Sequence, residues 1–329
     1  MNAQPTYLLG VDVGGTKIAA AVVTFEGQIL GQVRTPTEPH DQDRVVANVL
    51  RAMREVIAQA GLQIPQIAAI GLGAPGDVDP ERGVAIRAVN IRWDNLPFVH
   101  IVQDDFKVPA FIENDVRAAT LGELYFGAGR EHRNLVYLSV GTGIANGVVI
   151  DGRLYRGVHG MAGEIGHAVF DRRGPRCACG IRGCLEAMAA GPAMAHRAGE
   201  WINAGRPSTL MQMAGNDVAN ITGKMVLDAA ARGDPVATDA VEEAAAYLAI
   251  AILMLHRLYD PEIVVLGGGI AQAGEVILAP IRQVLERELL SSILTCEHVL
   301  RLSELGSDTG ILGAVAIAIQ GLREKGKEN

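Results

Sequence analysis

Three of the four cysteines in the 329-residue chain fall within eight residues, as Cys177-x-Cys179-x₄-Cys184. Three thiolates and one imidazole form a ligand set that suits a tetrahedral structural Zn²⁺. His167, ten residues before Cys177, is the nearest candidate for the fourth ligand, and His159 is the alternative. Glycines in the same segment permit the tight turns that wrap closely spaced ligands around one ion. The pattern therefore predicts a structural zinc site.

Two carboxylates bracket this predicted metal loop. Glu164 precedes His167 by three residues, and Glu186 follows Cys184 by two. Carboxylates accept hydrogen bonds from sugar hydroxyls, and a metal-bound loop would hold them rigid. If His167 gives one ring nitrogen to zinc, the other can meet the substrate. The alternative for either glutamate is an ordinary solvated loop charge.

A second polar group, Glu113-Asn114-Asp115, falls where a predicted strand becomes a predicted helix. A carboxylate in the place of Asp115 can be the general base that takes a proton from a hydroxyl nucleophile. It can also be the N-cap of the helix that begins near Val116. The two roles are compatible.

Three predicted strands end in glycine turns, where backbone N–H groups can converge on an anion. Three such turns suit a polyphosphate, although each can also be an ordinary hairpin turn. Asp12 lies at the mouth of the first turn, where it can hold Mg²⁺ through water or simply cap the turn. There is neither GxGxxG spacing nor a Walker signature. The residues of the three turns are Gly14, Gly15, Thr16 and Lys17; Gly141, Thr142 and Gly143; and Gly267, Gly268 and Gly269.

Hydrophobic periodicity places these groups at the ends of alternating elements. Strands are predicted at 7–13, 17–23, 28–35, 67–73, 110–113, 135–140, 147–150, 153–156 and 262–266. Helices are predicted at 43–60, 116–126, 275–290 and 309–320, with a polar tail at 323–329.

The opening of the chain is repeated later in the sequence. Asp12–Val22 overlays Ser139–Val149 without a gap, at an offset of 127 residues. The repeat predicts a duplicated α/β architecture with two halves that face each other. We expect an N-terminal domain at 1–117, joined by the C-terminal helix in 309–329, and a larger domain at 118–308 that carries the zinc loop.

Composition excludes several classes of protein. A hydrophobic content of 49% is not that of a disordered chain, and a net charge of −8 does not suit a general binder of nucleic acid or anionic membrane. The N-terminus shows no secretory signal, and the longest apolar run, Ala244–Leu255, is too short for a bilayer and predicts a buried helix. We therefore expect a cytosolic protein, in which clustered cysteines bind metal and Cys296, which stands apart, is simply buried.

Taken together and in order, these motifs resemble those of the ROK family of bacterial sugar kinases. Gly-Glu-x-Gly-His followed by CxCGxxGCxE is the most specific of them. The segments that carry the resemblance are Asp12-Val-Gly-Gly-Thr-Lys17, Glu113-Asn-Asp115, Leu138-Ser-Val-Gly-Thr-Gly143, Gly163-Glu-Ile-Gly-His167, Cys177-Ala-Cys-Gly-Ile-Arg-Gly-Cys-Leu-Glu186 and Leu266-Gly-Gly-Gly269. They span almost the whole chain.

The resemblance implies the actin-like (ribonuclease H-like) two-domain ATPase fold, with ATP and sugar in a cleft between the domains. It implies Asp115 as the catalytic base and His167 with the three cysteines as a zinc site. The implied sugar-contacting residues are Gly76, Asn90, Asn114, Asp115, Glu164, His167 and Glu186. The implied ATP contacts are Asp12 and the three glycine turns. One departure is Ala145-Asn146, where the family usually has more glycine, and which could narrow the approach to phosphate.

The function implied is phosphorylation of a hexose by ATP with Mg²⁺. The chain length and the intact Glu164, His167 and Glu186 favour D-glucose, and kinases for N-acetylmannosamine, N-acetylglucosamine or fructose are the alternatives within the family. A sugar-responsive repressor is disfavoured because only six residues precede the first predicted strand. A binding protein without catalysis is disfavoured by Asp115. The resemblance also implies a homo-oligomer, either a dimer or a tetramer.

Overall fold

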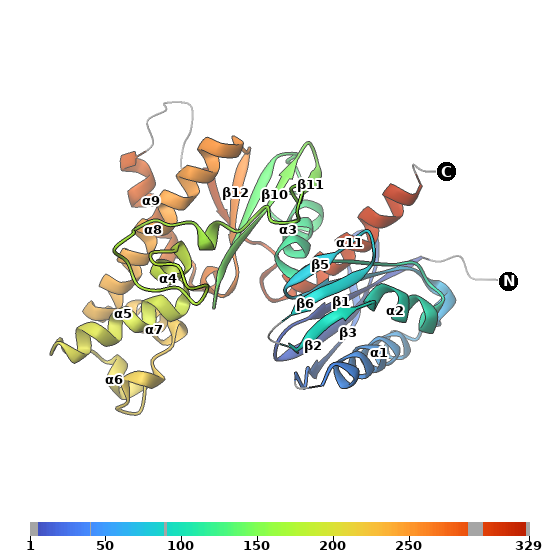
Figure 1. The fold of residues 1–329 in the computed structure, drawn as a ribbon, viewed down its shortest axis with the longest axis horizontal. Coiled ribbons are helices and arrows are strands. Elements are labelled where there is room, and N and C mark those ends of the chain that lie inside the picture. The colour runs from blue at the N-terminus through green and yellow to red at the C-terminus, as the bar shows by residue number, and fades with distance from the viewer. Residues whose placement is uncertain (1–5, 40, 89–90, 289–298, 327–329) are drawn as a thin grey trace. The chain divides into compact units, whose positions relative to one another are not determined.

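The computed structural model describes residues 6–39, 41–88, 91–288 and 299–326, and these fall into two compact units (Figure 1). The first unit comprises Met1–Arg130 and Glu304–Asn329, and the second comprises Glu131–Ser303. The expected domain boundary after residue 117 falls inside helix α3 (Asp115–Phe126), which is continuous. The two compact units instead meet in sequence after Arg130. Asn90 and Cys296 lie outside the described residues.

The first unit is built on a five-stranded sheet in the order β3-β2-β1-β4-β8. The first three strands form an antiparallel meander, and β4 and β8 continue the sheet in parallel with β1. A separate three-stranded sheet, β5-β6-β7, was not predicted from the sequence. The strands are β1 (Tyr7–Val13), β2 (Lys17–Val23), β3 (Ile29–Pro36), β4 (Ile67–Ala74), β5 (Asp77–Asp79), β6 (Val84–Ala88), β7 (Trp93–Leu96) and β8 (Ala110–Asn114).

Helices cover both faces of the five-stranded sheet (Figure 1). On one face α1 (Gln42–Gln59), capped by Asp41, and α2 (Phe98–Phe106) close a large apolar core. On the other face α11 (Thr309–Lys325) packs on β1 and β4 and runs alongside α3. The C-terminal helix thus extends five residues beyond its predicted end, into the predicted polar tail. Short 3₁₀ turns occupy η1 (Ile64–Gln66) and η6 (Gly306–Asp308).

The second unit repeats this sheet pattern in the order β11-β10-β9-β12-β13. Three antiparallel strands are again followed by two parallel ones, of which β13 was not predicted. The strands are β9 (Leu135–Val140), β10 (Ile144–Ile150), β11 (Arg153–Tyr155), β12 (Ile263–Gly267) and β13 (Leu300–Leu302).

A group of helices buries one face of this second sheet. The longest is α8, which contains the apolar run predicted to be a buried helix. The helices are η3 (Ile165–His167), α4 (Leu185–Ala189), α5 (Gly191–Asn203), α6 (Leu210–Met213), η4 (Val218–Asn220), α7 (Gly223–Ala230), α8 (Pro235–Tyr259), η5 (Gly269–Ala273) and α9 (Glu275–Glu288).

The duplication is present, but the ungapped overlay predicted for it is wrong by one residue. Val13 pairs with Ile18 across the first turn, which leaves four residues between them, whereas Val140 pairs with Ile144 across the second, which leaves three. The offset is therefore 127 residues between β1 and β9 and 126 between β2 and β10. Core-facing side chains follow these offsets, since Ile18 and Ile144 both point into the large core of their unit.

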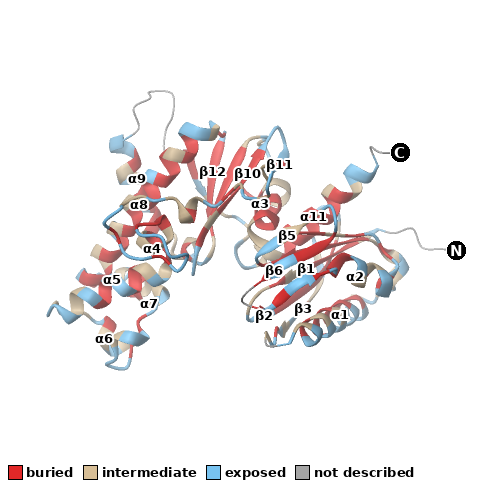
Figure 2. Cartoon of the chain, viewed as in Figure 1, coloured by how far each residue is buried: buried red, intermediate tan, exposed pale blue. Residues whose placement is uncertain are grey.

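The central strands of both sheets are buried along nearly their whole length (Figure 2). A strand that is paired on both edges and buried on both faces has a nearly continuous apolar sequence. Such runs are easy to recognise, so these strands could be predicted. In the part of the chain that the structure describes, none of the helices combines the length and apolarity that crossing a membrane would need.

Candidate active site and metal centre

The candidate base lies at the turn from β8 into α3, in the first unit. Asn114, not Asp115, is the N-cap of α3: its Oδ1 accepts hydrogen bonds from the backbone N–H groups of Val116 at 3.0 Å and Arg117 at 3.3 Å. Its Nδ2 donates to the carbonyl of Gly76 at 3.0 Å. Two of the predicted sugar-contacting residues, Asn114 and Gly76, are thus brought together by a direct bond.

Asp115 is therefore free of the capping role. Its Oδ1 accepts from the N–H of Val116 at 2.8 Å. Burial raises the pKa of Asp115, while the hydrogen bonds from Val116 and Asn114 and the charge of Arg117 lower it. A carboxylate held at a raised pKa binds a proton more readily than one in water, as a general base requires.

Asp12 is the second acidic group of this unit. It lies on β1, pairing with Ala19 of β2 and, on its other side, with Gly73 of β4. Burial, followed by the negative charge of Asp115, raises the pKa of Asp12 to about 6, against a smaller lowering by Lys17. The two carboxylates are thus close enough to repel each other. Among the described residues, none donates a hydrogen bond to the Asp12 carboxylate, so the structure gives no support to a turn-capping role.

The first glycine turn is instead held by its own backbone and by Thr37. Gly14 N–H donates to the carbonyl of Lys17 at 2.9 Å. Thr37, fully buried, donates from Oγ1 to the carbonyl of Gly14 at 2.7 Å and from its N–H to that of Thr16 at 3.1 Å. The motifs did not point to Thr37, although the hairpin pairing of Lys17 with Pro36 is a signal that could have found it.

In the second unit, a cavity of about 750 Å³ opens beside the second glycine turn. Gly141, Thr142 and Gly269 line it, whereas Gly267 packs against Tyr137 and Gly268 against Val140. The first residues of α5 and α7 supply further lining that the sequence analysis missed. These walls are largely apolar, with polar groups at Thr222, Lys224, Asp228 and Gln272. A glycine turn that can bind phosphate, at the edge of an apolar cavity, is an arrangement that can bind a nucleotide.

Ala145 and Asn146 lie just beyond this turn. Both lie within β10, which begins at Ile144 rather than at the predicted Gly147, and pair with Ser139 and Leu138 of β9. The effect of these two residues on the approach of phosphate stays a prediction.

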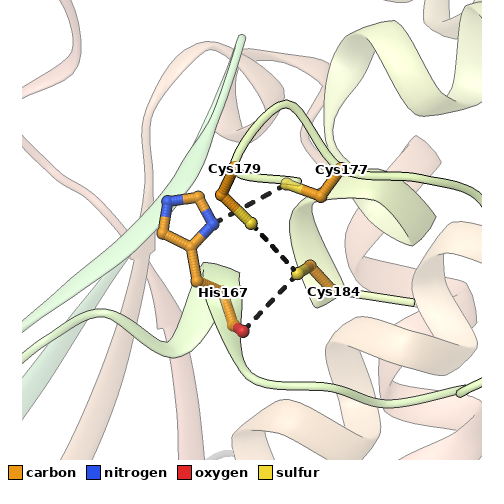
Figure 3. A group of neighbouring side chains, drawn as sticks. All are labelled: His167, Cys177, Cys179 and Cys184. Carbon is orange, nitrogen blue, oxygen red and sulfur yellow. Dashed lines mark hydrogen bonds between the residues drawn. The ribbon is translucent and has the colours of Figure 1, made fainter. Parts of the chain in front are cut away.

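The metal ligands predicted from the sequence are brought together (Figure 3). One donor atom from each of His167, Cys177, Cys179 and Cys184 lies within 4.8 Å of all the others, and His159 is not part of the group. Cys177 Sγ is 3.7 Å from His167 Nδ1, and Cys179 Sγ is 3.6 Å from Cys184 Sγ.

The chemistry of these donors fits a metal ion. Burial raises the pKa of Cys184 to about 12 and raises that of Cys177, whereas the backbone N–H of Ile181 lowers that of Cys179. A divalent cation would offset the cost of ionising the two buried thiols. One imidazole and three thiolates at these separations match a closed tetrahedral zinc site.

The two bracketing carboxylates differ in their surroundings. Glu164 is exposed at the start of η3. Glu186 is the second residue of α4, and its Oε2 accepts from the N–H of Ile144 at 3.1 Å while its Oε1 lies 3.6 Å from Cys177 Sγ. Glu186 is therefore not a simple solvated charge, whereas Glu164 remains exposed to solvent.

The chain is similar to known proteins along nearly its whole length. The profile of the ROK family matches residues 8–321. A glucokinase from Halalkalibacterium halodurans is 35% identical over 326 residues, which is 98% of each chain. The crystal structure of a ROK family glucokinase from Streptomyces griseus in complex with glucose and AMPPNP is 35% identical, with a TM-score of 0.81 over 96% of this chain and 100% of that one. A xylose repressor from Caldicellulosiruptor bescii is 29% identical, and the match covers 97% of this chain and 79% of the repressor.

The raised pKa of Asp12 predicts a pH-dependent gain in stability for Asp12→Asn. The native carboxylate binds its proton more tightly than the unfolded one, so this group's contribution to the free energy of unfolding is lost as pH rises from about 4 to about 6. The amide avoids that loss. We expect Asp12→Asn to be more stable than the wild type by on the order of 2 kcal/mol at pH 7.5, and by progressively less as pH falls toward 5.

Urea unfolding of both proteins between pH 5 and 8 measures this difference. Asp104→Asn, which changes a carboxylate that is 87% exposed, serves as the matched control and should show no such trend. A difference that does not vary with pH, or a less stable variant at pH 7.5, would contradict the prediction.

Proposed function

The chain belongs to the ROK family, and we propose on this basis that it is an ATP-dependent hexose kinase whose preferred substrate is D-glucose. The observation that carries the proposal is the position of the Asp115 carboxylate, held at the turn from β8 into α3 by the N–H of Val116 and beside the bonded pair Asn114 and Gly76. Similarity to glucokinases over nearly the full length supports it.

In the proposed reaction, Asp115 accepts the proton of a sugar hydroxyl as its oxygen attacks the γ-phosphorus of ATP, and ADP departs with the electrons of the broken P–O bond. Such a transfer depends on positioning and charge neutralisation more than on covalent catalysis. Asp12 would hold the Mg²⁺ that accompanies ATP, through water. Backbone N–H groups of the glycine turns, with the hydroxyls of Thr16 and Thr142, would bind phosphate oxygens.

On the sugar side, we propose that Gly76, Asn90, Asn114, Glu164, His167 and Glu186 contact the hexose. His167 also belongs to the zinc site, with Cys177, Cys179 and Cys184. When bound, Zn²⁺ would fix these four side chains relative to one another. The chain's own contribution is to hold Glu164 and Glu186 at either end of the metal-bearing segment, where they can accept hydrogen bonds from sugar hydroxyls.

We further propose that the protein acts in the cytosol, on a sugar and ATP, as a homo-oligomer of two or four subunits. The reducing cytosol keeps thiols available for metal, which agrees with a cluster of three cysteines and no disulfide among the described ones.

Steady-state kinetics with ATP and a panel of sugars tests the substrate. We expect kcat/KM to be highest for D-glucose and lower for fructose, N-acetylglucosamine and N-acetylmannosamine. A higher kcat/KM for an acetamido sugar would reject glucose while keeping the kinase, and no turnover of any sugar would reject the kinase.

Replacement of Asp115 by Asn tests the base. Because the amide cannot accept the proton, we expect kcat to fall about 10²–10⁴-fold while glucose affinity changes little. Calorimetry with glucose measures the second quantity, and Asp104→Asn should match the wild type in both. An undiminished kcat would remove Asp115 from the role of base.

Metal analysis tests the zinc site. We expect about one Zn²⁺ per chain in the purified protein, and loss of zinc with weaker glucose binding in Cys179→Ser, because Glu164 and Glu186 would lose their fixed support. Thermal unfolding before and after dialysis against a chelator should show a lower Tm without metal. A metal-free preparation with full activity and an unchanged Tm would contradict this role.

A regulatory role is the second candidate, favoured by the similarity to a xylose repressor. It predicts specific duplex DNA binding that sugar relieves, which a gel shift measures. We expect no shift, because the net charge of −8 does not favour contact with phosphate backbones.

A further inference from the structure

The carboxylate of Glu186 reaches the strand that leaves the second glycine turn. Its Oε2 accepts from the N–H of Ile144 at 3.1 Å, and Ile144 is the residue that follows the turn Gly141–Gly143. A Cβ placed on Gly143 would lie only 2.6 Å from the same oxygen. The carboxylate therefore occupies the space that a side chain at Gly143 would need, and the hydrogen bond from Ile144 ties it to the end of the turn.

The metal-bearing segment holds the same strand from another direction. The N–H of Asn146 donates to the carbonyl of Gly163 at 2.8 Å. A Cβ on Gly166 would lie 1.8 Å from the carbonyl oxygen of Ile144, and one on Gly163 would lie 1.9 Å from that of Asn146. The glycines of Gly163-Glu-Ile-Gly-His167 thus allow this segment to lie directly on the first residues of β10.

The place of Glu186 is in turn fixed by the cysteine cluster. Cys184 immediately precedes α4, so the cluster sets where the first turn of this helix begins, and Glu186 is its second residue. The chain of contacts runs from Cys184 through Glu186 to Ile144 and the turn. On the other side of that turn, Gly141 and Thr142 line the large cavity of the second unit.

We propose that Glu186 is a positioning residue for the phosphoryl donor. By accepting the N–H of Ile144, it fixes the exit of the turn Gly141–Gly143, so that the metal cluster supports nucleotide binding as well as sugar binding. This inference rests on the proposed kinase function. It differs from a sugar contact by Glu186, because it assigns the residue a role that exists when no sugar is bound.

Three variants separate these roles. Glu186→Ala removes the acceptor for Ile144. Glu186→Gln keeps an acceptor oxygen of similar reach. Gly143→Ala places a methyl group where Oε2 lies, and Gly143 is not among the glycines with positive φ, so the new residue meets no backbone strain. Glu164→Ala is the matched control, since it removes an exposed carboxylate from the same metal-bearing segment.

The measurement is calorimetric titration of each zinc-loaded protein with Mg²⁺ and a non-hydrolysable ATP analogue in the absence of sugar, and separately with glucose in the absence of nucleotide. Zinc content is determined for every sample. We expect Glu186→Ala and Gly143→Ala each to weaken nucleotide binding about tenfold, and Glu186→Gln to restore most of it. Glu164→Ala should weaken glucose binding alone. The double variant Glu186→Ala with Gly143→Ala should bind nucleotide only slightly more weakly than either single variant, because both changes break the same contact, between Glu186 and Ile144.

Two results would overturn the proposal. Wild-type nucleotide affinity in Glu186→Ala, with glucose affinity reduced, would make Glu186 a sugar ligand only. Nucleotide affinity that falls only in samples that have lost zinc, and stays intact in zinc-loaded Gly143→Ala, would assign the effect to metal loss rather than to the hydrogen bond. Failure of the wild type itself to bind the ATP analogue and to phosphorylate any sugar would instead reject the kinase function on which the proposal rests.

Discussion

Parallel strand pairing is the constraint on which both sets of functional residues depend. In the first unit, β1, β4 and β8 run parallel, so their carboxyl ends meet at one edge of the sheet and bring Asp12, the segment leading to Gly76, and Asn114 together. In the second unit, the parallel pairing of β9 with β12 places the glycine turn that follows β9 next to Gly269. Backbone pairing of the strands thereby brings together residues that are far apart in sequence, without a direct bond between their side chains.

Two neighbouring carboxylates of the first unit suggest how an acidic protein could bind acidic ligands. Asp12 and Asp115 are both half-buried and repel each other, and desolvation raises the pKa of each carboxyl. Such a pair is poorly satisfied alone and favours a cation or a proton donor beside it. A divalent ion and a sugar hydroxyl are the partners that would satisfy the two carboxylates. With a net charge of −8, the protein as we propose it would hold phosphate locally, by backbone N–H groups and an ion, rather than by a basic surface.

The actin-like duplicated α/β fold implied by the family resemblance is confirmed. The sequence points to candidate residues that stand in short motifs, namely the cysteine cluster, Asp115 and the glycine turns. Of these, the cysteine cluster is brought together with His167 as predicted. Sequence reasoning missed Thr37 and the cavity lining from α5 and α7, because these reach the turns only through tertiary packing. It also placed the possible cap of α3 at Asp115, whereas the cap is Asn114; both residue types are good caps, and only the backbone geometry selects between them.

The two glycine turns differ in length by one residue, and this difference limits how the two halves can be recombined. Side chains alternate between the two faces of a strand, so adding or removing one turn residue exchanges the inward and outward sets of the strand that follows. The four-residue turn of the first unit and the three-residue turn of the second are therefore not interchangeable parts. A chimera that replaces the three-residue turn of the second unit with the four-residue turn of the first would direct Ile144 away from its core.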